Sequence, residues 1–202
     1  MVKNPTRSGV ERLTKVVIRA LISAVAVIAS VTACGTANDE EDANPGPGIA
    51  LTSTSMIDGA IPSRYACYEA GAGLSLAWSA APATTKSFAI IARDLDSVLS
   101  SVLGPFVHWV IYDIPSSEHE LPDALPPQPE FPNRIRQGIN GFDKVGFAGP
   151  CPPGRSWHRY EFKVYALDTT LNLPSGMTRK TVLAAMKGHV VASGSLIGRY
   201  KR

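Results

Sequence analysis

Apolar and polar positions alternate along much of the chain beyond residue 73, which is typical of β-strands. In the segment 158–166 the alternation places His158, Tyr160 and Phe162 on one face. In the segment 106–114 the same rule places His108 and Tyr112 on one face of an otherwise apolar strand. Runs rich in β-branched and aromatic residues, bounded by Gly, Pro, Asp and Ser, predict strands at 74–78, 87–93, 106–114, 158–166 and 192–200.

Only one segment has a clear helical pattern. Thr178 can cap a helix over residues 179–187, and Gly188 stands where a helix stop is expected. The apolar residues on one face of this segment are Val182, Leu183 and Met186. A strand-dominated chain with one late helix predicts a mainly β fold, a two-sheet sandwich with a small α component.

The first 33 residues have the pattern of a secretory signal. Basic residues precede an apolar run, residues 20–33, which is shorter than the roughly 20 residues of a membrane-spanning helix. The run ends in Val-Thr-Ala followed by Cys34, which resembles the lipobox of bacterial lipoproteins, where the cysteine is acylated. We expect an exported protein anchored to the cell membrane through Cys34; a plain signal or an uncleaved anchor is the alternative.

A change in composition separates the signal from the folded part. Residues 34–48 are rich in Asn, Asp, Glu, Pro and Gly and have few apolar side chains, so they are interpreted as a flexible tether. Residues 49–202 are predicted to form a single domain. Removing residues 1–33 takes away five of the 20 basic and one of the 17 acidic residues, which changes the formal charge from +3 to about −1. This charge gives no support to nucleic-acid binding.

Three cysteines occur in the chain. If Cys34 is acylated, Cys67 and Cys151 remain, and two cysteines in an oxidising compartment are commonly paired. We predict a disulfide between them, with two buried thiols as the alternative.

The segment 115–133 contains six prolines and no periodicity, and it is long for a connector. It is interpreted as a surface loop or a flap over a pocket.

Polar side chains that could form a site occur in three separate stretches. The segment 149–160, Gly-Pro-Cys-Pro-Pro-Gly-Arg-Ser-Trp-His-Arg-Tyr, is rigid in composition and leads into a strand. Asp94 and Asp96 follow a buried strand at i and i+2, where both carboxylates can point the same way. His108 lies in the apolar strand described above. Taken singly, such a histidine is usually a core group, and aspartates at strand ends usually bond a turn.

Together these stretches resemble the phosphatidylethanolamine-binding protein family, in particular its bacterial Raf-kinase-inhibitor-like branch, over residues 49–202. The matching stretches are Ile61-Pro62, Tyr65-Ala66-Cys67, Asp94-Leu95-Asp96, Val107-His108-Trp109, residues 149–154, His158-Arg159-Tyr160, Ala166-Leu167-Asp168, Gly188-His189 and Gly198-Arg199-Tyr200. Two stretches depart from the family's pattern. The two prolines of the family's Asp-Pro-Asp-Ala-Pro are replaced by Leu95 and Val98. The family's Tyr-Thr-Cys-Asp-Gly is Tyr-Ala-Cys-Tyr-Glu at residues 65–69 of this chain.

The resemblance implies a two-sheet β fold with a C-terminal helix and one small anion pocket. The ligand-binding residues that it implies are Asp94, His108, Gly149, Pro150, His158 and Tyr160, and we expect Asp96, Pro152 and Trp157 at the pocket edge. Imidazoles, the tyrosine hydroxyl and backbone N–H groups can donate to an anion, whereas Asp94 is expected to orient a histidine.

The sequence favours binding over catalysis. No Gly-x-Ser-x-Gly elbow, no His-Glu-x-x-His and no Cys-x-x-Cys occurs, so neither a hydrolase nucleophile nor a metal site is expected, and no cofactor is implied. The leading hypothesis is a membrane-anchored, non-catalytic binding protein for phosphate or a phospholipid head group. The alternatives are a regulator or inhibitor of a protein partner, such as a hydrolase or a signalling protein, and a phosphoester or ester hydrolase.

Overall fold

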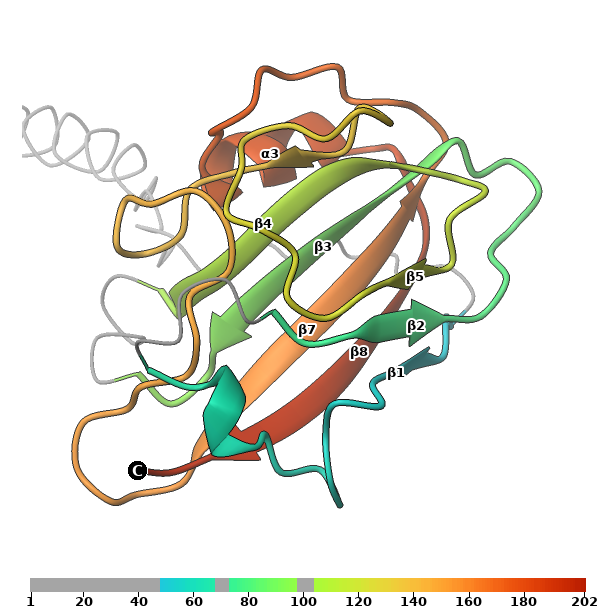
Figure 1. Cartoon of the computed structure of the whole chain (residues 1–202). Coiled ribbons are helices and arrows are strands. Elements are labelled where there is room, and N and C mark those ends of the chain that lie inside the picture. Colours follow the sequence, from blue (N-terminus) through green and yellow to red (C-terminus); the bar gives the residue numbers. More distant parts are fainter. Residues whose placement is uncertain (1–47, 68–72, 98–103) are drawn as a thin grey trace, which may run out of the picture. The chain divides into compact units, whose positions relative to one another are not determined.

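Two antiparallel β-sheets form the framework of the described residues, 48–67, 73–97 and 104–202, in the computed structural model (Figure 1). These residues all lie within one unit, residues 40–202. The predicted signal peptide, Cys34 and nearly all of the predicted tether lie outside the described residues. The elements are β1 Leu51–Thr52, the 3-10 helix η1 Ser63–Tyr65, β2 Leu76–Trp78, β3 Ser87–Asp94, β4 Phe106–Pro115, β5 Glu120–Leu121, β6 Arg136–Gln137, β7 His158–Leu167, α3 Arg179–Met186 and β8 Val190–Tyr200.

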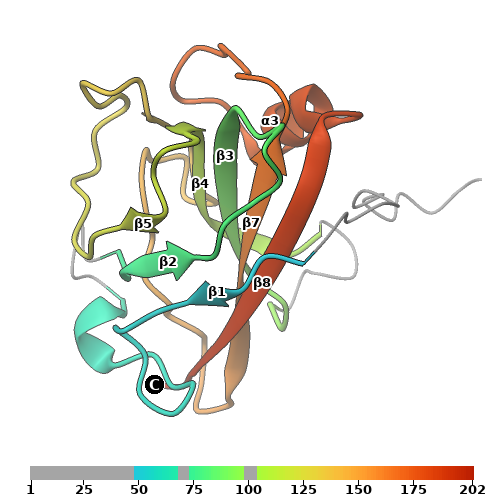
Figure 2. The ribbon, with the colours of Figure 1, turned by 90° about the vertical axis from the view of Figure 1, so that its right-hand side faces the viewer.

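The larger sheet has the order β6-β4-β3-β7-β8, and the smaller one has the order β1-β2-β5. β3 lies at the centre of the larger sheet and is apolar on both faces, since Ile90 is buried on one face and Ile91 on the other. Both faces of this strand are therefore covered by other parts of the chain, and Figure 2 shows the smaller sheet and α3 on opposite sides of it.

The main core lies between the two sheets. Leu76 and Trp78 of the smaller sheet pack against Phe88, Trp109 and Phe162 of the larger one. Loop 115–133, predicted as a surface loop or a flap over a pocket, covers this core: it contains β5, and its Leu125 and Phe131 pack against the cluster. Burying apolar surface from both sides of β3 is the principal stabilising term of this fold.

A second core lies between the larger sheet and α3. Val182 and Met186, on the predicted apolar face of the helix, are fully buried there together with Tyr112. The Thr178 side chain accepts from the Thr181 N–H as an N-cap, and Gly188 has a φ of +81° just beyond the helix. Both predicted ends of this helix are confirmed within one residue.

The predicted mainly β, two-sheet fold with one late helix is confirmed. The five predicted strands are present with shifts of at most two residues at their ends, β2 beginning at Leu76 and β8 at Val190. The two-residue strands β1, β5 and β6 were not predicted, because a pair of residues carries no detectable periodicity.

One prediction about strand faces is wrong. Tyr112 packs toward α3, whereas the ring of His108 contacts Tyr160 of the core between the sheets, with centroids 5.1 Å apart. An irregularity in the pairing of β4 is the reason and is described below.

Within the described ranges, no helix is long and apolar enough to cross a membrane. The same part of the chain contains no cluster of three or more His, Cys, Asp or Glu side chains suited to a metal ion.

Candidate functional site

A β-bulge in β4 sets the direction of His108. Ala92 of β3 pairs with Trp109, but the next residue, Arg93, pairs with Val107, so His108 is an extra residue on its strand. A bulge lets consecutive side chains depart from strict alternation and is frequent next to functional sites. His108 and Trp109 therefore both lie on the side of Tyr160.

Asp94 and His158 form a buried pair across the sheet. Asp94 ends β3 opposite Tyr160, and His158 begins β7 two residues earlier. The Nδ1 atom of His158 lies 2.8 Å from Oδ2 of Asp94, and each side chain is only 7% exposed. The other carboxylate oxygen accepts from the Asp96 N–H at 2.8 Å, which fixes the carboxylate plane. The predicted role of Asp94 in orienting a histidine agrees with this geometry, and the histidine is His158.

His108 is held by the main chain. Its Nδ1 lies 2.7 Å from the Ala148 carbonyl oxygen, and a carbonyl can only accept, so Nδ1 carries the proton. Burial lowers the pKa of His108, an effect opposed by the Ala148 carbonyl and by the charge of Asp94. The free nitrogen Nε2 is therefore an acceptor in the neutral ring and becomes a donor only when the ring is protonated.

Tyr160 packs against both histidines. Its ring meets His108 edge-on and lies nearly parallel to His158, with centroids 6.4 Å apart. Its hydroxyl is buried and has no hydrogen-bond partner within the described part of the chain. Burial, and then the negative charge of Asp94, raise the pKa of this phenol, so it stays protonated and remains a potential donor.

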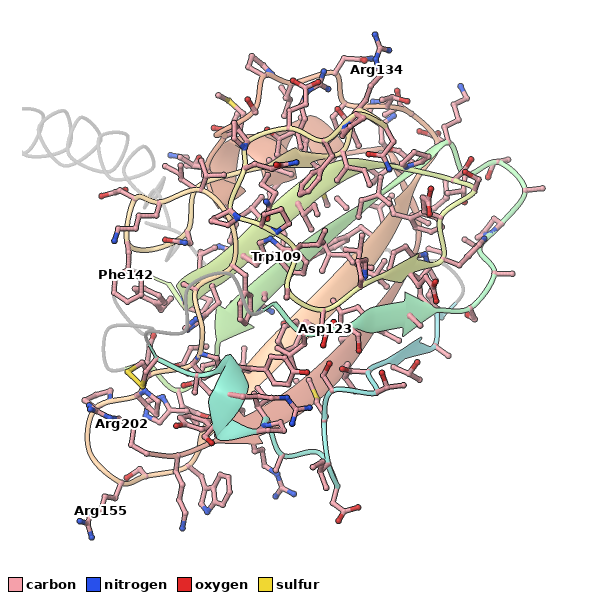
Figure 3. All side chains as sticks on the ribbon, in the orientation of Figure 1. Trp109, Asp123, Arg134, Phe142, Arg155 and Arg202 are labelled. Atoms are coloured by element: carbon pink, nitrogen blue, oxygen red, sulfur yellow. A yellow bond between two sulfur atoms is a disulfide. The ribbon has the colours of Figure 1, made fainter. Side chains whose placement is uncertain are left out.

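These side chains border a pocket of about 410 Å³. Asp94, His108 and His158 supply its ionisable groups, and Ser97 and Cys151 also reach it. Its apolar walls are Pro105, Phe106, Val107, Phe142, Pro152 and Pro153. Figure 3 shows Phe142 at the edge of the molecule, on the side where the disulfide lies.

The predicted disulfide between Cys67 and Cys151 is present, with the two Cα atoms 4.6 Å apart. The Cys67 N–H also donates to the Pro150 carbonyl at 2.9 Å, and the Ala148 N–H donates to the His108 carbonyl at 2.8 Å. A side chain at Gly149 would collide with the main chain at Tyr65 and Ala66, which explains the glycine. The 148–151 wall is thus fixed on one side to η1 and on the other to β4.

Asp96 does not face the pocket. Its carboxylate accepts from the Arg159 main-chain N–H at 2.8 Å and from the guanidinium at 2.9 and 2.7 Å. The Arg159 hydrogen bonds lower the pKa of Asp96 to about 2. The i, i+2 pattern therefore does not bring two carboxylates into one site, because Asp96 lies beyond the end of β3, where the chain has left the strand.

The structure gathers most, but not all, of the residues implied for the site. Asp94, His108, Gly149, Pro152 and His158 line the pocket. Tyr160 lies behind the histidine rings, and Pro150 is buried with its carbonyl directed to Cys67. Trp157 is 54% exposed and contacts Lys201, away from the lining. Binding roles for all of these residues stay predictions.

Sequence reasoning missed the aromatic walls. Phe106 and Phe142 meet edge-on with centroids 4.8 Å apart, and Phe106 also contacts His108 at 4.9 Å. Phe106, two residues before His108, could have been suspected from strand position. Phe142 lies in an irregular segment, where no periodicity indicates which way a side chain points.

The family model for phosphatidylethanolamine-binding protein matches residues 52–201. The chain belongs to the phosphatidylethanolamine-binding protein family. A UPF0098 protein of Aquifex aeolicus is 45% identical over 144 residues, covering 70% of this chain and 81% of the relative. One from Pyrococcus abyssi is 42% identical over 157 residues, covering 76% and 85%.

Two solved structures have the same fold. A phosphatidylethanolamine-binding protein homologue of Chlamydia trachomatis superposes with a TM-score of 0.67 at 32% identity, covering 78% of this chain and 99% of that one. Escherichia coli YbcL, described as a member of the mammalian family, gives 0.65 at 27% identity, covering 76% and 98%. Family membership thus accounts for the two-sheet fold and its single helix.

Proposed function

We propose that this protein is a non-catalytic binding protein for a small anion, phosphate or a phospholipid head group. The observation that carries the proposal is the pair of buried imidazoles, His108 and His158, at one pocket. Both use Nδ1 for protein contacts, which leaves Nε2 of each ring available to a ligand.

Anion binding at this pocket requires proton uptake. An anion needs donors, and each Nε2 becomes a donor only in the imidazolium form. The groups that face His108 are Asp94 from β3 and His158 and Tyr160 from β7. A bound anion favours protonation of His108 and so opposes the effect of burial on its pKa.

The affinity for an anion is therefore expected to fall as pH rises. In the ligand-free protein the pKa of His108 lies below its usual 6.5, and a bound anion raises this pKa. The affinity is therefore highest at pH values below the pKa of the ligand-free protein, and it declines as pH rises through the pKa of the complex. Calorimetric titration with phosphorylethanolamine and with sulfate, whose charge stays at −2 between pH 5 and pH 8, measures this. Flat affinity for both ligands between pH 5 and pH 8 would contradict the proposed function.

A histidine variant tests the site directly. His158→Ala is expected to weaken binding about 10- to 100-fold, the typical effect of losing one hydrogen bond to a charged group. His189→Ala is the matched control, because His189 is exposed and pairs with Asp168 outside the pocket. Equal affinities for the two variants would remove His158 from the binding site.

The absence of catalysis is part of the proposal. Around the pocket, Cys151 is held in the disulfide, and Ser97 Oγ accepts from the Phe106 N–H at 3.3 Å. Neither contact provides a nucleophile activated by a histidine. Hydrolysis of p-nitrophenyl phosphate that depends on His108 would overturn this part.

We further propose that the domain is tethered to the cell membrane through acylated Cys34, as the sequence around residues 31–34 indicates. Expression of the full chain with labelled palmitate is expected to label the wild type and not Cys34→Ser. Release of both proteins into the medium, with neither labelled, would instead indicate a plain signal peptide.

A further inference from the structure

Phosphate alone would leave most of this pocket unused. Its volume of about 410 Å³ is many times the roughly 30 Å³ that one water molecule occupies in the liquid, and it falls in the range of pockets that enclose a whole organic ligand. The ligand's size, charge and polarity can therefore be inferred from the walls.

The ionisable side chains of the described pocket lining can neutralise one negative charge of a ligand. Asp94 contributes −1, and His108 and His158 contribute at most +1 each, so the highest total is +1. Among the lining residues that the structure describes there is no Lys or Arg. Arg159, the basic residue next to His158, is committed to Asp96.

The net charge of +1 neutralises a bound monoanion, whereas a bound dianion would keep one unneutralised negative charge in a poorly solvated pocket. Burial at the site is strong enough to lower the pKa of His108 against the attraction of Asp94, which indicates how poorly charge is solvated here. An unpaired buried charge is costly. The second charge of a phosphomonoester therefore weakens binding.

The rest of the wall is suited to an apolar group. Phe142 is 57% exposed although it packs edge-on against Phe106. Pro152 and Pro153, which come from another stretch of the sequence, belong to the same pocket lining. An apolar group bound against these rings removes apolar surface from water, which adds to the affinity in proportion to the area covered.

We propose that the pocket selects a monoanion carrying an apolar group about the size of a phenyl ring, with the charge at His108 and His158 and the apolar group against Phe106 and Phe142. This inference rests on the proposed function and narrows its ligand class. The ligand chemistry is that of an ester or acid with one negative charge.

Four soluble ligands at pH 7.5 separate charge from apolar contact: methyl phenyl phosphate, dimethyl phosphate, phenyl phosphate and inorganic phosphate. Methyl phenyl phosphate is expected to bind tightest, about tenfold tighter than dimethyl phosphate because of the phenyl contact. Phenyl phosphate, with its second charge, is expected to bind several-fold more weakly than its methyl ester.

The outcomes distinguish this inference from the proposed function. Binding of inorganic phosphate as tight as that of methyl phenyl phosphate would overturn the inference and leave anion binding intact. Absence of binding for all four ligands at pH 5 as well as at pH 7.5, with a normally folded protein, would overturn both. Competition by phosphatidylglycerol vesicles would support the inference with a lipid as the source, and competition by soluble esters alone would support it with a free small molecule as the source.

A variant locates the apolar contact. Phe142→Ala is expected to reduce the gain from the phenyl group, the ratio of the dissociation constants of dimethyl phosphate and methyl phenyl phosphate measured on the same variant, to about threefold or less. Trp157→Ala removes another exposed aromatic ring, one outside the lining, and is expected to leave this ratio at its wild-type value. If Phe142→Ala keeps the full tenfold gain and the wild-type melting temperature, the assigned apolar subsite is wrong.

Discussion

Two aspartates separated by one residue have different tasks in this protein. Asp94 is buried against His158 at the pocket, whereas Asp96 is partly exposed and bonds Arg159 through both of its oxygens. The difference follows from position, because Asp94 is the last residue of β3 and Asp96 lies beyond it. Only the first of the two lines the pocket.

Asp96 is expected to contribute to stability in a pH-dependent way. Its pKa in the folded state, about 2, lies below the unfolded value of 3.8, so its contribution is complete above pH 3.8 and is lost as pH falls through 2. Arg159 is more than half exposed, so solvent screening limits the contribution to about 1 kcal/mol. Asp96→Asn should therefore lower the free energy of unfolding by about this amount at pH 7 and by distinctly less at pH 2, where about half of the Asp96 carboxyls are protonated in the folded state.

Urea unfolding at the two pH values measures the effect. Glu120→Gln is the control for loss of one exposed acidic charge, because no ion pair of Glu120 occurs in the described residues. An Asp96→Asn deficit as large at pH 2 as at pH 7 would show that the carboxylate charge is not its cause.

At the scale of elements, small irregularities in regular strands create the site. The extra residue in β4 turns His108 toward Tyr160, and the end of β3 presents Asp94 to the start of β7. The central parts of the same strands are apolar and form the core. A site at the strand ends thus rests on a rigid sheet and needs few residues of its own.

β8 shows how closely the segments of this unit approach one another. At Gly194 a Cβ atom would overlap the Ile49 carbonyl, where the chain segment leading into β1 crosses the sheet edge. Gly194→Ala is expected to destabilise the protein by about 1–3 kcal/mol, since the main chain on both sides must shift. Thermal unfolding measures this.

Gly48→Ala is the matched control, because nothing lies within 4 Å of a Cβ at that position. Its effect is expected to stay within about 0.5 kcal/mol. Similar melting temperatures for the two alanine variants would mean that the close approach at Gly194 is relieved without cost.

At the scale of the whole unit, the disulfide joins regions far apart in the sequence. Cys67 and Cys151 are separated by 84 residues, and the bridge fixes the pocket wall to η1. In the chain-entropy description, closing a loop of this length stabilises the folded state by about 4.5 kcal/mol. The bridge is therefore expected to contribute a large fraction of the total stability.

The double variant Cys67→Ala/Cys151→Ala is expected to have a lower denaturation midpoint than the oxidised wild type. Adding a reductant should lower the midpoint of the wild type toward that of the variant and leave the variant unchanged. Identical midpoints for oxidised protein and variant would show that the cross-link does not stabilise the fold.

The sequence determined the elements and most of the residues near the pocket. Alternation located the five long strands, and the Thr178 cap and Gly188 bounded the helix. The count of cysteines, with Cys34 set aside, indicated the disulfide between the other two. These features could be predicted because each depends on local periodicity, on cap chemistry or on a count.

The tertiary structure alone decided how these residues meet. It turned His108 away from the face shared with Tyr112, placed Asp94 rather than Asp96 on His158, and brought Phe142 from an irregular segment to the pocket wall. Each of these depends on pairing register or on a loop path. Register and loop path are set by packing between distant segments, which a pattern of neighbouring residues does not encode.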